Sequence, residues 1–557
     1  MTPEPHSLTD TDPTPAPPPG CPAHGLGPGG LRRVYGPEAE DLAALFEEIR
    51  AEHGTVAPVL LHNDVPVWLV LGLTENFQMV SNAAHYTRDS RQWRAVQDGT
   101  AGPDHPLAPI FTWQPFCSTA EGDEHLRLRG AVMGAVSTVD FRGMRRHIDH
   151  HTQVLVNRFC ERGSADLVGE FAEHLPMAVM CEVLGMPEEY GERLVQAARD
   201  MLKGTATAIA SNEYVTDVLM RLTLRRRAVP QDDFTSHLIN HPARLDDEEV
   251  CQHLRLVLIA AYESTANLIA NVLRMVLTDP RFRAQLNGGQ MTVPQAVEQS
   301  LWDDPPFTSV LGYFAKQDTE LGGKRIRKGD GLLLGIAPGN VDPAVRPDPR
   351  ANMMGNRAHL AFSAGRHECP GQDIGRAITE TCVDALLTRL PDVQLAVTEE
   401  ELRWSQTIQS RHLVELPVEF EPRAQQDVEV RPTSPAVHQP ELGPYPVATA
   451  VGPEARPISR ALPQPAPAPM PPSAPMPATA TMPPSTPMPS TATMPPGAPM
   501  PPATPMQQTV AATAPQTSTA SQTPAGQPEP APGRPRRPGL SRLRGAWRRL
   551  LRWRRGH

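Results

Sequence analysis

Cys369 is the residue whose surroundings point most directly to chemistry. It lies in the stretch FSAGRHECPGQDIGR, between Gly365 and Gly371. Glycine permits backbone conformations that a side chain would hinder, so the two glycines indicate a tight loop around the cysteine. A helical pattern follows at once, and the free N–H groups and positive dipole end of a helix N-terminus favour a thiolate over a thiol. An outward-facing thiolate on such a loop is what an axial haem ligand requires. The alternative is a small buried hydrophobe, the commoner use of a lone cysteine.

The order Phe362, Gly365, His367, Cys369, Gly371 resembles the haem-binding loop of the cytochrome P450 family, whose pattern is FxxGxxxCxG. The resemblance implies that Cys369 ligates the iron of haem b (iron protoporphyrin IX). It also implies that Phe362 and Gly365 shape the loop and that His367 holds a haem propionate. Outside the loop, further motifs in the family's order extend the resemblance to roughly residues 37–422.

Apolar spacing predicts the elements that must position this loop. The run Gln372–Leu390 has a helical apolar face, and Pro370 suits the first position of that helix. A helix is expected at about Pro37–His53, and the two apolar runs that flank His62-Asn63-Asp64 predict a β-hairpin. The segment Ala165–Glu188 predicts a short strand and then an apolar helix that packs in the core.

His125 and Arg129 lie four residues apart in EGDEHLRLRGAVMGAV, so they share one face of a predicted helix. Taken alone, the pair fits a solvated polar face. The resemblance implies that these two side chains donate hydrogen bonds to the haem propionates. Such pairing is favourable, because hydrogen bonds to an ionised carboxylate are stronger than those between neutral groups.

The longest helical pattern, Asp246–Leu277, carries Ala260-Ala261-Tyr262-Glu263-Ser264-Thr265 in an apolar centre. A buried glutamate is costly unless it is protonated, paired or hydrated. The resemblance aligns this stretch with A/G-G-x-D/E-T, which passes protons to iron-bound dioxygen, and so implies catalytic roles for Glu263 and Ser264. Ser264 stands where threonine is usual, and Ala261 where glycine is usual. The alternative is a polar group satisfied by helix carbonyls.

The segment AVEQSLWDDPPF resembles the family's E-x-x-R helix but departs from it. Gln299 and Trp302 stand where glutamate and arginine are expected, and Arg350 is the expected third partner. Tyr313 occupies a position where an arginine usually reaches a propionate, and its phenol can still donate a hydrogen bond. Either Gln299 and Trp302 supply a neutral substitute or haem retention is impaired, and we favour the substitute. The sequence E-Q-S-L-W at Glu298 to Trp302 resembles that of an actinobacterial, Streptomyces-type lineage of the family whose members lack E-x-x-R.

Composition divides the 557 residues into four parts. Residues 1–30 are rich in Pro, Gly and Thr and are expected to be disordered, and residues 31–423 are expected to form a mainly α haem-thiolate domain with small β-sheets. Residues 424–533 form a Pro/Ala/Thr/Met-rich disordered linker. Residues 534–557, with ten arginines and no acidic residue, predict a basic amphipathic helix.

Charge differs between these parts. Residues 424–557 carry 13 Arg against 5 Asp and Glu, so the remainder carries −18 while the whole chain carries −10. An acidic body argues against nucleic-acid binding. The basic tail fits contact with an anionic membrane surface, a solvated tail, or docking to an acidic partner. A cytoplasmic protein is predicted, because the seven cysteines are scattered without a CxxC pair and the sequence shows no signal peptide and no apolar run of 18 residues. The basic tail predicts peripheral placement of this protein at the inner membrane face.

The resemblance implies a monooxygenase that inserts one oxygen atom of dioxygen into a small organic substrate. Electrons are expected from a ferredoxin and its reductase, and so indirectly from NAD(P)H. The alternative is a non-catalytic or regulatory haem protein that the basic tail tethers to a membrane. The altered positions Gln299, Trp302, Tyr313 and Ser264 motivate this alternative.

Overall fold

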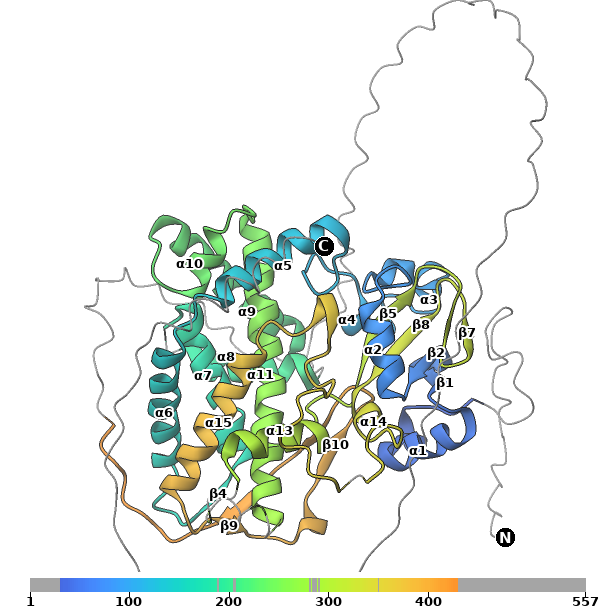
Figure 1. The fold of residues 1–557 in the computed structure, drawn as a ribbon. Helices are drawn as coiled ribbons and strands as arrows, with labels where there is room; N and C mark the ends of the chain where they lie inside the picture. The colour runs from blue at the N-terminus through green and yellow to red at the C-terminus, as the bar shows by residue number, and fades with distance from the viewer. Residues whose placement is uncertain are drawn as a thin grey trace, which may run out of the picture. The chain divides into compact units, whose positions relative to one another are not determined.

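The computed structural model describes residues 31–187, 190–203, 207–279, 282, 288, 291–348 and 350–428. This part of the chain is mainly helical, with four small sheets, which confirms the expected fold class (Figure 1). Its α-helices are α1 (Leu42–His53), α2 (Leu73–Ser81), α3 (Arg94–Gln97), α4 (Ala108–Phe111), α5 (Gly122–Val136), α6 (Phe141–Asn157), α7 (Leu175–Leu184), α8 (Gly191–Lys203), α9 (Ala208–Ala228), α10 (Phe234–Ile239), α11 (Asp247–Thr278), α13 (Val293–Asp303), α14 (Ile336–Asn340) and α15 (Gln372–Arg389). Residues 1–30 and 429–557, where the disordered segments and the basic helix were predicted, lie outside the described residues.

The strands build a sheet region beside the helices (Figure 1). The largest sheet has five strands in the order β1-β2-β8-β5-β3, and β2 and β8 are its parallel pair. A second sheet has the order β4-β12-β9, and two hairpins pair β6 with β7 and β10 with β11. The strands are β1 (Val56–Leu61), β2 (Val65–Val70), β3 (Tyr86–Thr87), β4 (Ser164–Asp166), β5 (Ser309–Ala315), β6 (Thr319–Leu321), β7 (Lys324–Ile326), β8 (Gly331–Gly335), β9 (Gln394–Leu395), β10 (Trp404–Gln406), β11 (Arg411–Leu413) and β12 (Pro417–Glu419).

The predicted hairpin is present as β1 and β2, which pair in antiparallel register from Val56 with Val70 to Leu61 with Val65. Asn63 and Asp64 make the turn with positive φ angles of 60° and 53°. Asparagine and aspartate tolerate this left-handed region better than other non-glycine residues.

The long helix α11 runs through the helical region and contacts α7, α9, α13 and α15 (Figure 1). Its N-terminus carries a capping box, in which Asp246 accepts from the amide of Glu249 and Glu249 accepts from the amide of Asp246. By length and composition α11 could cross a membrane, but 56% of its most apolar window is buried inside the protein. We interpret it as the core helix of the fold.

The helix α15 follows the cysteine loop and packs against α6, α11 and α13. Its apolar face, which includes Ile374, Ile378 and Leu386, is buried as predicted. The helix begins at Gln372 with Gly371 as its N-cap residue, so the expectation that Pro370 occupies the first helical position is wrong. Pro370 instead lies just outside the helix, where its fixed φ angle restricts the turn after Cys369.

The remaining predicted core segment is also present. Residues 164–166 form β4, and an apolar helix, α7, ends where Gly185 takes a left-handed conformation with φ 76°. No disulfide joins the six cysteines in the described part of the chain.

Candidate active site

The cysteine loop is closed by a hydrogen bond from the amide of Cys369 to the carbonyl oxygen of Phe362, at 2.8 Å. Gly365 has a φ of +69°, and a Cβ atom there would lie 2.7 Å from the carbonyl oxygen of Val80. Glycine is therefore required where the loop meets the end of α2. Gly371 has an ordinary φ of −95°, and a Cβ atom there would have no neighbour within 4 Å, so the backbone itself does not require glycine at this position.

The thiol of Cys369 is half-buried at the end of this loop. Burial raises its pKa above the usual value, although the amide of Gly371 and the charges of Arg129 and Arg376 act in the opposite direction. The helix N-terminus thus acts in the expected direction at this thiol, but burial outweighs it. A bound metal ion would stabilise the thiolate of Cys369 more strongly than the helix terminus does, because a thiol that coordinates a metal ion loses its proton.

Helix α5 and the cysteine loop bring the predicted propionate residues together. The rings of His125 and His367 lie with centroids 4.4 Å apart, and both side chains are buried. Arg129, one turn after His125 on α5, donates to the carbonyl oxygen of Glu368, directly before Cys369. Residues 239 positions apart in the sequence thus meet beside the cysteine.

Glu121 lies beside these histidines and was not identified from the sequence. It contacts His367 at 3.6 Å and Arg366 at 3.3 Å, and it accepts a hydrogen bond from the amide of Arg88 at 2.7 Å. Burial opposes its ionisation, but His367 and the amide of Arg88 outweigh burial and lower the pKa of Glu121 to about 2. Burial and the neighbouring His367 lower the pKa of His125 to about 4. At neutral pH the glutamate is charged and His125 is neutral.

Among the buried polar atoms near this cluster, Nε2 of His125 and Oη of Tyr313 have no hydrogen-bond partner in the described residues. An unsatisfied buried donor is costly, and such groups in native proteins usually face a bound group or an ordered water. Two histidines, a tyrosine and the arginines around them would suit the two carboxylates of haem. The residues therefore fit the implied cofactor.

On α11, Ser264 donates its hydroxyl hydrogen bond to the carbonyl oxygen of Ala260 at 2.7 Å. This local contact is the alternative that the sequence left open, and it does not prevent the same oxygen from accepting a further bond. Glu263 is half-buried by surface area, and burial raises the pKa of its carboxyl. A carboxyl that keeps its proton at higher pH can donate that proton.

The departures from E-x-x-R sit on α13 and face the segment 346–356. Gln299 accepts a hydrogen bond from the amide of Met353 at 2.7 Å and donates to Asp303 at 2.9 Å. Trp302 is fully buried, and its indole N–H donates to the carbonyl oxygen of Asn356 at 2.7 Å. The amide and the indole therefore hold the backbone of this segment without a charge at either position.

A charged contact exists nearby, but with other residues than expected. Arg346, with only 1% of its side chain exposed, donates to Asp303 at 2.7 Å and to the carbonyl oxygen of Ala351 at 3.2 Å. Arg350, the expected third partner, is exposed and lies outside this contact, so that expectation is wrong.

A second buried charge cluster ties α13 to the cysteine loop. Glu298 lies 2.6 Å from Nε of Arg376 and 3.0 Å from Nε2 of His359. The guanidinium of Arg376 in turn lies 4.4 Å from the ring centroid of Phe362. No pattern in the sequence predicts this cluster, because Glu298 and Arg376 are 78 residues apart and no spacing links them.

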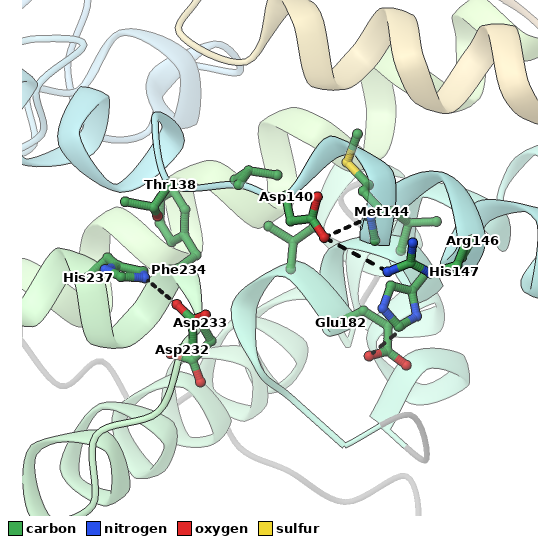
Figure 2. Close-up of a pocket in the computed structure, with 14 residues that line it drawn as sticks. Thr138, Asp140, Met144, Arg146, His147, Glu182, Asp232, Asp233, Phe234 and His237 are labelled. Atoms are coloured by element: carbon green, nitrogen blue, oxygen red, sulfur yellow. Dashed lines mark hydrogen bonds and ion pairs between the residues drawn. The ribbon is translucent and has the colours of Figure 1, made fainter. Parts of the chain in front are cut away.

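A separate pocket of about 290 Å³ lies between α6, α7 and the start of α10 (Figure 2). Asp140, Glu182 and Asp232 line it, with His147 and His237 beside two of these carboxylates. None of its lining residues belongs to the cysteine loop or to α11.

Known proteins resemble this chain over more than half of its length. Cytochrome P450-SU2 of Streptomyces griseolus is 32% identical over 299 residues, which are 53% of this chain and 74% of that protein. The chain belongs to the cytochrome P450 family. A 2-hydroxy-5-methyl-1-naphthoate 7-hydroxylase of Streptomyces carzinostaticus is 28% identical, over 70% of this chain and 97% of the hydroxylase. No family model matches the chain.

Solved structures agree with the P450 assignment. CYP154C4 from Streptomyces sp. W2061 has a TM-score of 0.63 at 27% identity, covering 68% of this chain and 95% of that one. The myxobacterial cytochrome P450 CYP267B1, solved with myristic acid, has a TM-score of 0.62 at 27% identity, covering 70% and 98%. The chain is thus a P450 monooxygenase that uses haem b with electrons from NAD(P)H through redox partners.

Proposed function

We propose that this P450 inserts one oxygen atom of dioxygen into a small organic substrate, with a ferredoxin as its direct electron donor. Two electrons and two protons convert the other oxygen atom to water, so a C–H bond of the substrate becomes C–OH. The observation that carries the proposal is the closed Cys369 loop beside the buried cluster of His125, Arg129 and His367.

In this proposal Cys369 would hold the haem iron through its thiolate, and the bound haem would supply the activation of dioxygen. Phe362 and Gly365 hold the loop, because the ring lies under Arg376 and the glycine meets α2. His125, Arg129 and His367 would bind the propionates, and Tyr313 would donate a hydrogen bond from its phenol.

Glu263 and Ser264 hold the protons that the reaction consumes. The raised pKa of Glu263 keeps a proton on its carboxyl to higher pH than an exposed glutamate would. The hydroxyl of Ser264, anchored on Ala260, keeps a fixed orientation on the same turn of α11.

The test is turnover with a surrogate ferredoxin, its reductase, NADPH and labelled dioxygen over a panel of small organic compounds. The proposal expects product that carries one labelled oxygen atom. If the haem is reduced by the ferredoxin but no compound in a broad panel is oxidised, the non-catalytic alternative is favoured instead.

We also propose that the enzyme is cytoplasmic and that residues 534–557 contact anionic membrane. This proposal is supported by the ten arginines of the segment and by the spacing of its apolar residues. In a helix, one stripe would carry Leu540, Leu543, Trp547, Leu550 and Leu551. Co-sedimentation with anionic vesicles should pellet the full chain and not a chain that ends at Arg423. Equal pelleting of the two would refute it.

A further inference from the structure

Tyr313 reaches its place through an irregularity in β5. The pairing of β5 with β8 shifts register between Leu311 and Tyr313, and Gly312 between them has a φ of +143°. Such a bulge re-aims the next side chain. Tyr313 is 3% exposed and its hydroxyl has no partner among the described residues. The family resemblance places an arginine at this position, so the chain lacks one expected cation here.

Arg88, just after β3, lies over this tyrosine. Its guanidinium carbon is 4.9 Å from the centroid of the Tyr313 ring, and its Nε donates to the carbonyl oxygen of Ser118 at 3.4 Å. A Cβ atom on Gly312 would lie 3.2 Å from this guanidinium. The glycine of the bulge therefore leaves the room that the arginine occupies.

The charge of Arg88 is not neutralised by a carboxylate in the described part of the chain. Glu121 is bound by the backbone amide of Arg88 and directs its carboxylate to Arg366 and His367. Arg88 nevertheless belongs to the same cluster, because Glu121 accepts from its amide at 2.7 Å and contacts His367 at 3.6 Å. A guanidinium thus remains beside the propionate residues without a negative partner.

A count of charges shows what this guanidinium could do. Haem brings two carboxylates, and the guanidinium of Arg366 is already paired with Glu121. Of the residues that the resemblance assigns to the propionates, Arg129 alone carries a guanidinium, because His125 and His367 are imidazoles and Tyr313 is a phenol. A buried carboxylate without a cation is costly, so one propionate would lack a charged partner.

We propose that Arg88, held over Tyr313 by the bulge at Gly312, is the cation that replaces the missing arginine and binds a haem propionate. This inference rests on the haem site proposed above. The competing role for Arg88 is that of a structural clamp, which would tie the end of β3 to β5 through the cation–π contact alone.

The test measures the rate at which ferric holoenzyme loses haem to excess apomyoglobin at pH 7. Arg88→Gln should lose haem about tenfold faster, because a charge-assisted hydrogen bond is removed. Arg88→Lys should stay near the wild-type rate, because the charge is kept. The matched control is Arg91→Gln, since Arg91 is paired with Asp89 and stacked on Trp113 outside the cluster.

The double variant Arg88→Gln/Tyr313→Arg separates the two roles. It restores a cation but not the arginine–tyrosine stack, so we expect it to return haem loss to within about threefold of wild type. An unchanged rate in Arg88→Gln would overturn the proposal, and so would fast loss in the double variant or in Arg88→Lys. If Arg88→Gln does not fold, the double variant and Arg88→Lys still decide the question. None of these readouts needs turnover, so failure here is distinguishable from failure of the proposed monooxygenase reaction.

Discussion

The indole N–H of Trp302 donates a hydrogen bond to the carbonyl oxygen of Asn356, at 2.7 Å. The family resemblance places an arginine at position 302, so a neutral donor on α13 holds the segment that a charged one would otherwise hold. A buried arginine needs a carboxylate partner, and the chain has none at position 299, where glutamine stands. Tryptophan keeps the donor and avoids the unpaired charge.

Trp302→Phe should therefore lower the free energy of unfolding by about 1–2 kcal/mol, because a hydrogen bond made by a fully buried indole is removed. The urea midpoint of the holoenzyme would report it. Trp113→Phe is the matched control, because the indole N–H of Trp113 has no partner in the described part of the chain. Equal midpoints for Trp302→Phe and wild type would contradict the role given to this hydrogen bond.

Glu298→Gln should destabilise the fold more than the loss of one charge suggests. Arg376 and His359 would be left buried without their carboxylate, a change that typically costs about 3–5 kcal/mol. Since Arg376 lies over Phe362, the cysteine loop should loosen and the haem content should fall.

Arg357→Ala provides the control for this prediction, because Arg357 contacts the same carboxylate at 3.3 Å but is 65% exposed. An exposed ion pair contributes at most about 1 kcal/mol, so this variant should keep its haem. The interpretation fails if the two variants lose haem equally.

Glu263→Gln should make the enzyme more stable and less active at neutral pH. Burial raises the pKa of Glu263 above 4.5, so ionisation at neutral pH favours the unfolded state, and its contribution to stability is lost as pH rises through the folded-state pKa. The stability gain of the variant should therefore vanish below pH 4.5, where the carboxyl is neutral in both states. Unfolding midpoints at several pH values, with product yield per NADPH consumed, would check both parts.

Ser264→Ala should lower the fraction of NADPH that is converted to product, because it removes the hydroxyl that Ala260 anchors. Ser264→Thr keeps the hydroxyl and adds the stiffer β-branched side chain, so its coupling should equal or exceed that of wild type. The ratio of product to NADPH in both variants measures this. Equal coupling in the alanine variant would remove Ser264 from the proposed proton path.

Local patterns predicted much of this fold from the sequence. The capped, apolar run of α11, the hairpin around Asn63 and the helix after Cys369 each follow from neighbouring residues, and all three are present. The differences from the predictions concern details that packing decides. Pro370 falls outside its helix, and burial outweighs the helix dipole at Cys369.

The long-range charge network could not be predicted in the same way. Nothing in the sequence distinguishes buried Arg346 from exposed Arg350 four residues later, because their difference arises from how the segment folds against Asp303. The same holds for Glu121 and Arg88, whose neighbours come from α5, β5 and the cysteine loop. A helix face or strand register is local, but the partner of a buried charge is set by tertiary contacts.

The most direct test of the account is the spectrum of the dithionite-reduced carbon monoxide complex of the full chain, beside Cys369→Ala. The account predicts a Soret band at the position typical of thiolate-ligated haem in the wild-type chain, and its absence in the variant. A band at the position of thiol-ligated or detached haem in the wild-type chain, or no bound haem, would contradict it.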